Sequence, residues 1–268
     1  MAHPFEYDVQ AAFDARLVSE RQQQGVMQSE LTYMATSNQR RAASLLRPIG
    51  DGPFAVVLYV HWYEPHACDS NRTQFLDEAK AMASKGVMSL LIETMWSDRE
   101  WFLKRTQAGD YDASVQQVIE LRRAMDLLLS QPDVDPERFA YVGHDFGAMY
   151  GVLAGSVDAR PSCYVLMAGT PRFPDWLLYY PQLDGDERAE FIEQMKFLDP
   201  IERVGRLSST PILFQFGNLD PHVPVERAHA FTDAAGEGAE SRSYEAGHDL
   251  NDQARRDRMA WLEMKLRL

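Results

Sequence analysis

The sequence has little cysteine, no surplus of positive charge and no long apolar run. Its two cysteines, Cys68 and Cys163, form no CxxC pair, so neither a disulfide scaffold nor a cysteine-rich zinc site is expected, and a reducing compartment such as the cytoplasm fits. Against 40 acidic residues there are only 27 basic ones, and the net charge of −13 argues against a non-specific nucleic-acid binder. No apolar run approaches the roughly 20 residues that span a bilayer, and residues 1–20 lack the apolar core of a secretory signal.

The remaining composition is that of an ordinary folded protein, with 45% hydrophobic and 25% charged residues in a chain of 268. Such a chain can bury a large core, and α/β chains of this size often form one domain. The sequence contains no internal repeat, low-complexity tract or linker rich in Pro and Gly. We therefore predict a single domain over residues 1–268.

Short apolar runs alternate with amphipathic segments along most of the chain. The nearly continuous apolar run at 54–62 (FAVVLYVHW) is typical of a strand buried in a parallel sheet. Strands that alternate with helices indicate βαβ units, and hence a mostly parallel sheet with helices on both faces. We predict strands over 54–62, 87–96, 138–143, 163–169, 211–217 and 241–247, and helices over 72–84, 112–130, 146–155, 225–236 and 252–266.

The N-terminal region precedes this alternation. Residues 8–24 predict an accessory helix, because Val9, Phe13 and Leu17 would share one face. Such a helix could cover the body of the protein or mediate a homodimer. Residues 30–47 alternate in a way that predicts a hairpin.

The segment 170–205 is irregular and rich in aromatic residues. Insertions at the carboxyl ends of strands in such sheets lie near the ligand crevice, and ligand pockets favour aromatic linings. We interpret this segment as a small lid. The alternative is an ordinary surface excursion that packs on its own aromatic residues.

The most informative motif is GHDFG at 143–147, which follows a predicted strand and precedes a predicted helix. In a Gly-x-nucleophile-x-Gly turn the two glycines let the chain bend sharply, and the central side chain is exposed above the sheet in a strained conformation. Here the central residue is Asp145. Asp220 and His248 each come directly after a later predicted strand, so all three side chains would emerge at one edge of the sheet in the order nucleophile, acid, histidine.

From about residue 30 to its end the chain resembles an α/β-hydrolase. Its body is similar to the dienelactone-hydrolase-like branch in the segments YVHWYEP, VGHDFGAMYG, FQFGNLDPHVP and EAGHDLND. The turn itself resembles that of epoxide hydrolases and haloalkane dehalogenases, which have Asp where esterases and lipases have Ser. The resemblance implies an α/β-hydrolase fold, a catalytic triad of Asp145, Asp220 and His248, a small-molecule substrate and no cofactor.

An aspartate nucleophile suits reaction at saturated carbon. A carboxylate with an ordinary pKa near ~3.9 is already ionised at pH 7. Attack on an acyl carbon would give a mixed anhydride, whereas attack on an sp3 carbon gives an alkyl ester that persists until it is hydrolysed. His248 would then activate the water that hydrolyses the ester, and Asp220 would hold the imidazole in the required tautomer.

Hydrolysis of that ester passes through an oxyanion, which needs N–H donors. The resemblance implies that these are the backbone N–H groups of Phe146 and Trp62. The pair His61-Trp62 replaces the His-Gly pair common in the family.

The leaving group separates two reactions. In epoxide hydrolases lid tyrosines protonate the epoxide oxygen, which makes Tyr179 and Tyr180 candidates, together with Tyr63 from another loop. Haloalkane dehalogenases bind the halide with N–H donors and usually have Trp directly after the nucleophile, where this chain has Phe146. The remaining indole candidates are Trp62, Trp96 and Trp176. We expect epoxide hydrolysis, with dehalogenation as the alternative.

Other charged residues are candidates for substrate binding. Glu93 ends a predicted buried strand and would need a partner such as Arg72 or Arg99. Arg99 or Arg172 would suit a substrate carboxylate, which arginine binds bidentately. The histidines share no metal-ligand spacing with acidic partners, so no metal site is expected.

Two further readings of the site stay open. In one, the protein is an esterase or a C–C hydrolase in which Asp145 acts as a base. In the other, it is a catalytically silent relative that binds a small molecule. A silent site has no physical need for both Asp220 and His248, which favours an active enzyme.

Overall fold

The computed structural model describes residues 3–67, 69 and 71–268. The strands are Arg16–Gln23 (β1), Val26–Thr36 (β2), Gln39–Pro48 (β3), Phe54–Val60 (β4), Val87–Ile92 (β5), Val134–His144 (β6), Cys163–Met167 (β7), Ile212–Gly217 (β8) and Ala239–Tyr244 (β9). The helices are Leu76–Ala83 (α1), Trp101–Lys104 (α2), Gln107–Leu129 (α3), Phe146–Gly155 (α4), Pro174–Leu177 (α5), Gly185–Met195 (α6), Val225–Ala235 (α7) and Asp252–Leu266 (α8). Short 3-10 helices cover Met95–Ser97, Lys196–Leu198, Pro200–Glu202 and Val204–Leu207.

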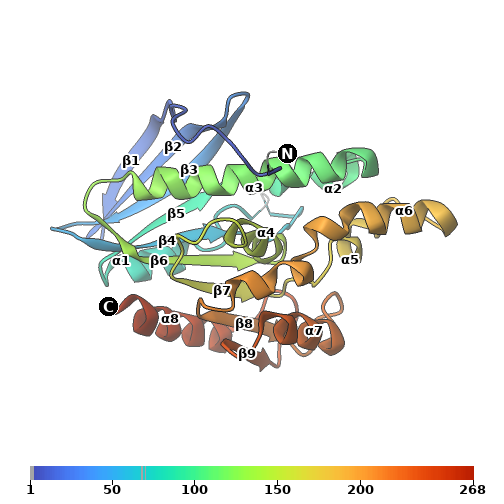
Figure 1. Cartoon of the computed structure of the whole chain (residues 1–268). Coiled ribbons are helices and arrows are strands. Elements are labelled where there is room, and N and C mark those ends of the chain that lie inside the picture. The colour runs from blue at the N-terminus through green and yellow to red at the C-terminus, as the bar shows by residue number, and fades with distance from the viewer. Residues whose placement is uncertain (1–2, 68, 70) are drawn as a thin grey trace.

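The strands form one sheet in the order β1-β2-β3-β5-β4-β6-β7-β8-β9 (Figure 1). Strands β4 to β9 pair in parallel, whereas β1, β2 and β3 pair antiparallel and join the sheet through an antiparallel β3–β5 contact. The prediction of a mostly parallel sheet flanked by helices is confirmed. Because the parallel strands all end at the same edge, the loops that follow them are brought together there.

The central strand β4 shows why its sequence reads as a continuous apolar run. Val56 and Leu58 face a core formed with α3, α4 and α7, while Val57 and Tyr59 face a second core formed with α1 and α8. Figure 1 shows α3 and α8 on opposite sides of the sheet. A strand covered on both faces has no solvent side on which polar residues would alternate.

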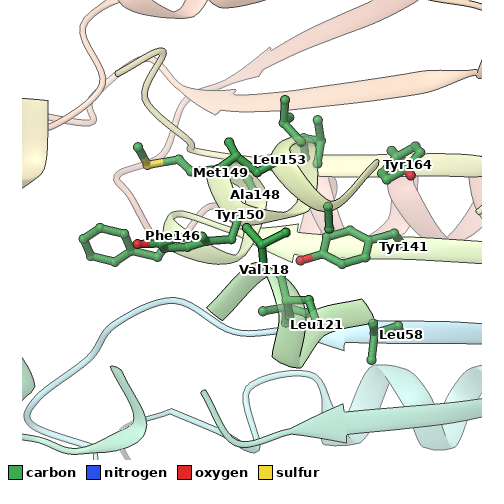
Figure 2. Packing of buried hydrophobic residues seen from close by; sticks show 14 of the residues in the cluster. Leu58, Val118, Leu121, Tyr141, Phe146, Ala148, Met149, Tyr150, Leu153 and Tyr164 are labelled. Carbon is green, nitrogen blue, oxygen red and sulfur yellow. The ribbon is translucent and has the colours of Figure 1, made fainter. Parts of the chain in front are cut away.

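Helix α4 packs closely on β6 and on α3. Figure 2 shows Met149, Leu153 and Tyr150 of α4 near Val118 and Leu121 of α3, and all five side chains are buried. A Cβ at Gly151 would lie 2.2 Å from the Tyr141 ring on β6, so the helix can approach the strand only with glycine at that position. This close contact fixes the start of α4 relative to the end of β6.

The predicted N-terminal helix over 8–24 is wrong. The structure has strand β1 at Arg16–Gln23, paired with β2, and no helix between residues 8 and 15. The turn between β1 and β2 places Gln24 and Gly25 at φ of 52° and 78°, which is the two-residue hairpin geometry that glycine permits. Of the residues expected on a helix face, Val9 and Leu17 are exposed, and only Phe13 packs against the core.

The segment 170–205 contains α5, α6 and two of the 3-10 helices, and it lies at one end of the molecule beside α2 and α7 (Figure 1). The buried Arg105, just after α2, donates hydrogen bonds to the carbonyl groups of Leu177 and Tyr180 and pairs with Asp110. These contacts hold the segment against the body. Its role as a lid stays a prediction.

Two further expectations concern the chain as a whole. Among the described residues, no helix combines the length and apolarity needed to cross a membrane. Cys163 is buried with a free thiol, and Cys68 lies outside the described residues.

Candidate active site

A sharp turn joins β6 to α4 and carries Asp145. The backbone of Asp145 has φ of 53° and ψ of −116°, a conformation that is costly for a residue with a side chain. The two glycines of the motif allow the turn, because a Cβ at Gly143 would lie 2.3 Å from the Gly147 carbonyl and a Cβ at Gly147 would lie 2.2 Å from the Val60 carbonyl. A strained acidic residue at this place is a feature that needs a functional explanation.

Asp220 and His248 lie beside this turn. Asp220 follows β8 and His248 follows β9, and the Asp220 Oδ2 to His248 Nδ1 distance is 2.7 Å. The other Asp220 oxygen accepts hydrogen bonds from the backbone N–H groups of His222 and Val223, which fix the carboxylate. His248 Nε2 then faces Asp145, at 3.9 Å from Oδ2. The three residues that the sequence placed at one sheet edge are therefore in mutual reach.

The charges of these groups depend on one another. Burial alone would lower the pKa of His248, but the Asp145 and Asp220 carboxylates outweigh burial and raise that pKa to about 9. Burial raises the pKa of Asp145, while the His248 imidazolium and the backbone N–H groups of Phe146 and Tyr63 act in the opposite direction. The net effect leaves the pKa of Asp145 raised, and the His248 imidazolium at neutral pH lies between the side chains of Asp145 and Asp220.

A cavity of about 370 Å³ opens above Asp145. Its walls are mostly aromatic and include no arginine or lysine. The lining residues are Trp62, Tyr63, Glu64, Phe102, Asp145, Phe146, Trp176, Tyr179, His222 and His248. The Trp62 ring stacks parallel to the His248 ring, with ring centres 5.2 Å apart, and the Trp176 ring lies edge-on to it. We call this the aromatic cavity.

Four buried polar atoms of residues that line the aromatic cavity have no hydrogen-bond partner within the described part of the chain. They are Trp62 Nε1, Trp176 Nε1, Asp145 Oδ1 and His248 Nε2. Buried polar atoms in folded proteins nearly always have partners. One cavity is thus lined by two residues with unpartnered indole donors and by the two residues of the triad with an unpartnered oxygen and nitrogen, which marks it as a place where a ligand with an acceptor atom would be held.

The backbone N–H groups near Asp145 differ from the sequence-based expectation at one position. The Phe146 N–H lies at the start of α4 and acts on the Asp145 carboxylate, as does the Tyr63 N–H. The Trp62 N–H instead donates to the side-chain oxygen of Gln74 at 3.1 Å. The second N–H donor near Asp145, besides that of Phe146, is thus that of Tyr63 instead of Trp62, one residue further along the loop after β4 than the resemblance implied.

The three tyrosines that were candidates for protonating the leaving group do not come together in the aromatic cavity. Tyr63 lines the aromatic cavity, but its hydroxyl donates to the Arg99 carbonyl at 2.7 Å. Tyr179 lines the cavity at a position where it is 48% exposed. Tyr180 is 51% exposed and is not part of the lining.

The remaining candidates lie outside the aromatic cavity. Glu93 accepts a hydrogen bond from the backbone N–H of Ala42, which is a structural contact between β5 and β3 rather than a pairing with an arginine. Trp96 is fully buried behind Phe146 and donates its indole N–H to the His61 carbonyl. Arg99 donates to the Pro65 carbonyl, and Arg172 lines a different cavity beside α5 and α6.

Sequence reasoning missed several residues at this site. Phe102, Glu64 and His222 line the aromatic cavity, and Gln74 and His144 make hydrogen bonds around it. His222 stands two residues after Asp220, which was the available signal. His144 ends β6 and precedes Asp145 in the GHDFG motif, and Phe102 lies in α2. Glu64 and Gln74 come from loops whose course no local pattern specifies. Among residues 3–67, 69 and 71–268, no group of three or more His, Cys, Asp or Glu side chains could hold a metal ion.

Solved structures similar to this chain are hydrolases. Acetyl xylan esterase 1 from Thermoanaerobacterium sp. JW/SL YS485 has a TM-score of 0.76 and 13% identity, over 95% of this chain and 89% of that chain. Acetyl xylan esterase from Paenibacillus sp. R4 has a TM-score of 0.73 and 16% identity, over 95% and 90% of the two chains. A putative dienelactone hydrolase from Klebsiella pneumoniae has a TM-score of 0.64 and 16% identity, over 91% and 99%.

No protein-family model matches the sequence, and neither does any curated protein that was compared with it. At 13–16% identity the likeness to solved structures shows the fold and no more. The chain has the α/β-hydrolase fold, as the resemblance implied. What the site does must be argued from its own residues.

Proposed function

We propose that this protein is a hydrolase in which Asp145 attacks a saturated carbon and displaces a halide, and that His248 then directs water onto the resulting ester. The observation that carries the proposal is that Trp62 and Trp176, whose indole N–H groups have no partner within the described part of the chain, line the same cavity as Asp145. Indole donors suit a halide, which can only accept hydrogen bonds. The positions of Tyr63, Tyr179 and Tyr180 give less support to epoxide opening, which needs a converging acid.

In the first step an Asp145 oxygen forms a bond to carbon, and the carbon–halogen bond breaks with its electron pair leaving on the halide. The indole N–H groups of Trp62 and Trp176 stabilise the developing negative charge. The cavity walls hold the alkyl chain against aromatic rings. Because no arginine or lysine lines the cavity, the proposal favours an uncharged haloalkane over a haloacid.

The first step also prepares the second. Esterification removes the negative charge of Asp145, which is one of the two charges that raise the pKa of His248. The pKa of His248 therefore falls, and the imidazole loses its proton and becomes a base that can take a proton from water. The hydroxide adds to the ester carbonyl, and the N–H groups of Phe146 and Tyr63 stabilise the oxyanion. On collapse, the bond between the carbonyl carbon and the alkoxy oxygen breaks and the His248 imidazolium gives its proton to the departing oxygen, so that the alcohol is released. The acid formed at Asp145 then gives its proton to His248, which restores the carboxylate and the imidazolium.

A second candidate is ester hydrolysis, because two of the similar solved structures are acetyl xylan esterases. In this reaction His248 and Asp145 would activate a water that attacks the substrate carbonyl. Asp145 would form no covalent bond, because a mixed anhydride would itself be a reactive acyl donor.

A single turnover in water enriched in oxygen-18 separates the two reactions. With excess enzyme and a primary bromoalkane, the proposal predicts that the heavy oxygen enters the Asp145 carboxylate and that the alcohol carries the original aspartate oxygen. With an ester substrate and direct attack by water, the label appears only in the released acid. Turnover of bromoalkanes without label in the Asp145 peptide would contradict the proposal.

A further inference from the structure

A chain of three hydrogen bonds joins Trp62 and His248, which line the aromatic cavity, through Gln74 and His144, which do not. The Trp62 backbone N–H donates to Gln74 Oε1 at 3.1 Å. The Gln74 side-chain nitrogen lies 2.6 Å from His144 Nδ1, and His144 Nε2 lies 2.8 Å from the His248 carbonyl. We call this chain the Gln74–His144 bridge. It connects the loop after β4, the residue before Asp145 and the loop after β9.

The direction of every hydrogen bond in the bridge is determined by its two ends. A backbone N–H can only donate, so the Gln74 oxygen faces Trp62 and its NH2 group faces His144. A backbone carbonyl can only accept, so His144 Nε2 carries a proton. His144 Nδ1 then accepts from Gln74 and carries none. His144 is therefore the neutral tautomer with its proton on Nε2.

The surroundings of His144 keep it neutral. The residue is 1% exposed, and its burial, followed by the nearby charge of His248, holds the pKa of His144 well below its usual range. Its ring centre lies 4.5 Å from that of Trp62 and 5.4 Å from that of His248. A second imidazolium at this distance would oppose the proton that His248 carries in the resting site.

We propose that Gln74 and His144 are positioning residues: Gln74 holds His144 in its neutral Nε2–H tautomer, and His144 holds the His248 backbone in the place from which its imidazole reaches the Asp145 ester. The bridge also fixes the loop that presents the Tyr63 N–H, because Trp62 precedes Tyr63. The expected effect on reaction rates rests on the proposed function. The assignment of the His144 tautomer rests only on the hydrogen bonds and does not depend on the reaction.

The bridge acts mainly on the second step. Hydrolysis of the ester needs His248 and the Tyr63 N–H, both of which lie on loops that the bridge connects. Of the groups that the attack by Asp145 needs, only Trp62 belongs to the bridge, and it does so through its backbone N–H rather than through its indole. Small misplacements of reacting groups cost up to about 100-fold in rate. We expect Gln74→Leu to slow release of the alkyl group about 10- to 100-fold and to slow alkylation less than about threefold.

Gln117→Leu is a matched control. Gln117 is also a glutamine whose side-chain oxygen accepts a backbone N–H, that of Met95 at 2.7 Å, and it is 1% exposed. Among the described residues, Gln117 is not part of the lining of the aromatic cavity and forms no hydrogen bond with the bridge. Single-turnover reactions of the three proteins with 1-bromobutane, quenched in acid and analysed by mass spectrometry, give the fraction of alkylated enzyme with time. Accumulation of alkylated enzyme in Gln74→Leu alone is the expected result, and equal release rates in the two variants would overturn the inference.

Two further measurements keep the inference testable if Gln74→Leu does not fold or 1-bromobutane does not react. Gln74→Glu keeps the acceptor for the Trp62 N–H but presents a carboxylate acceptor, instead of the NH2 donor, to the unprotonated His144 Nδ1. Its release rate should therefore stay as low as that of Gln74→Leu, and recovery of the wild-type rate would contradict the role of the Gln74 NH2 group. In the unreacted wild-type enzyme, nitrogen-15 NMR should show His144 neutral and protonated on Nε2 between about pH 6 and pH 9. A proton on His144 Nδ1 would overturn the inference, whatever reaction the enzyme catalyses. If instead NMR confirms the Nε2–H tautomer but no bromoalkane alkylates the enzyme, the result would count against the proposed function alone.

Discussion

Two cavities lie on either side of α5, and they differ in a way that shows what marks a site. The cavity that contains Arg172 has a volume of about 620 Å³ and is lined largely by charged residues. There, Arg227 pairs with Asp175 at 3.1 Å, and Asp199 accepts the Phe173 N–H at 2.9 Å. The aromatic cavity is smaller, at about 370 Å³, but four buried polar atoms of its lining residues have no partner within the described part of the chain.

The size and the charge of a cavity are therefore weaker indicators of a ligand-binding site than buried hydrogen-bonding groups without partners. In the larger cavity these charged groups have partners in the folded chain, so they contribute to structure. In the aromatic cavity, two indole N–H groups, a carboxylate oxygen and an imidazole nitrogen are all held without one. Substitutions in the two cavities should therefore have very different consequences.

The largest effect is expected from Asp145→Asn. The amide removes the nucleophile while keeping the size of the side chain, and we expect turnover to fall by about 10⁴-fold or more, as for the loss of other covalent nucleophiles. Steady-state release of halide measures this effect. Intact-mass analysis must exclude deamidation back to aspartate, and activity that survives this check would refute the role of Asp145.

A smaller effect is expected from Trp176→Phe. The ring is retained and one indole N–H is lost, so alkylation should slow by about 100-fold, by analogy with the loss of one oxyanion donor. The matched change Tyr179→Phe, which removes a hydroxyl from the same cavity, should alter alkylation less than about threefold. Rapid-quench kinetics with 1-bromobutane measure both. A larger effect at Tyr179 than at Trp176 would reverse the preference for halide over epoxide.

The third prediction concerns the charge of His248. Asp145→Asn removes one of the two carboxylates that raise the pKa of His248 to about 9, so that pKa should fall and the imidazole should lose its proton at lower pH. NMR titration of His248 in both proteins measures the change. By the same argument, alkyl release from wild-type enzyme should rise with pH through the lowered pKa. An unchanged or higher pKa would contradict the coupling.

The smallest effect is expected in the larger cavity. Arg172→Ala changes an exposed residue that has no contact with the aromatic cavity, so the kcat and KM for bromoalkanes should stay within about twofold of wild type. A loss of tenfold or more would mean that the larger cavity takes part in the reaction and that the comparison drawn above fails.

The fold and the triad positions were predictable where local sequence and final structure agree. The apolar run of β4 and the pattern of α8, which spans Asp252–Leu266, indicate their structures without reference to the rest of the chain. The glycines of the 143–147 turn are required by close backbone contacts, so they are visible as a motif. Asp220 and His248 follow strands, and the sheet brings them together.

Other features depend on contacts between distant segments. Residues 16–23 have helical spacing but form a strand because β2 offers a pairing edge. The Trp62 N–H is taken by Gln74, and no local pattern shows that the next residue supplies the donor near Asp145. The same holds for the Tyr63 hydroxyl, whose partner is a backbone carbonyl at Arg99.

The most direct test of the central claim is to trap the covalent intermediate in His248→Gln. This variant keeps the Asp145 carboxylate and the indole donors but lacks the base that releases the alkyl group. After incubation with primary bromoalkanes from bromoethane to bromohexane and digestion, we predict that the peptide containing Asp145 gains the mass of the alkyl group, and that Asp145→Asn with His248→Gln gains none. Absence of the adduct across the whole series, or an adduct on another residue, would contradict the account.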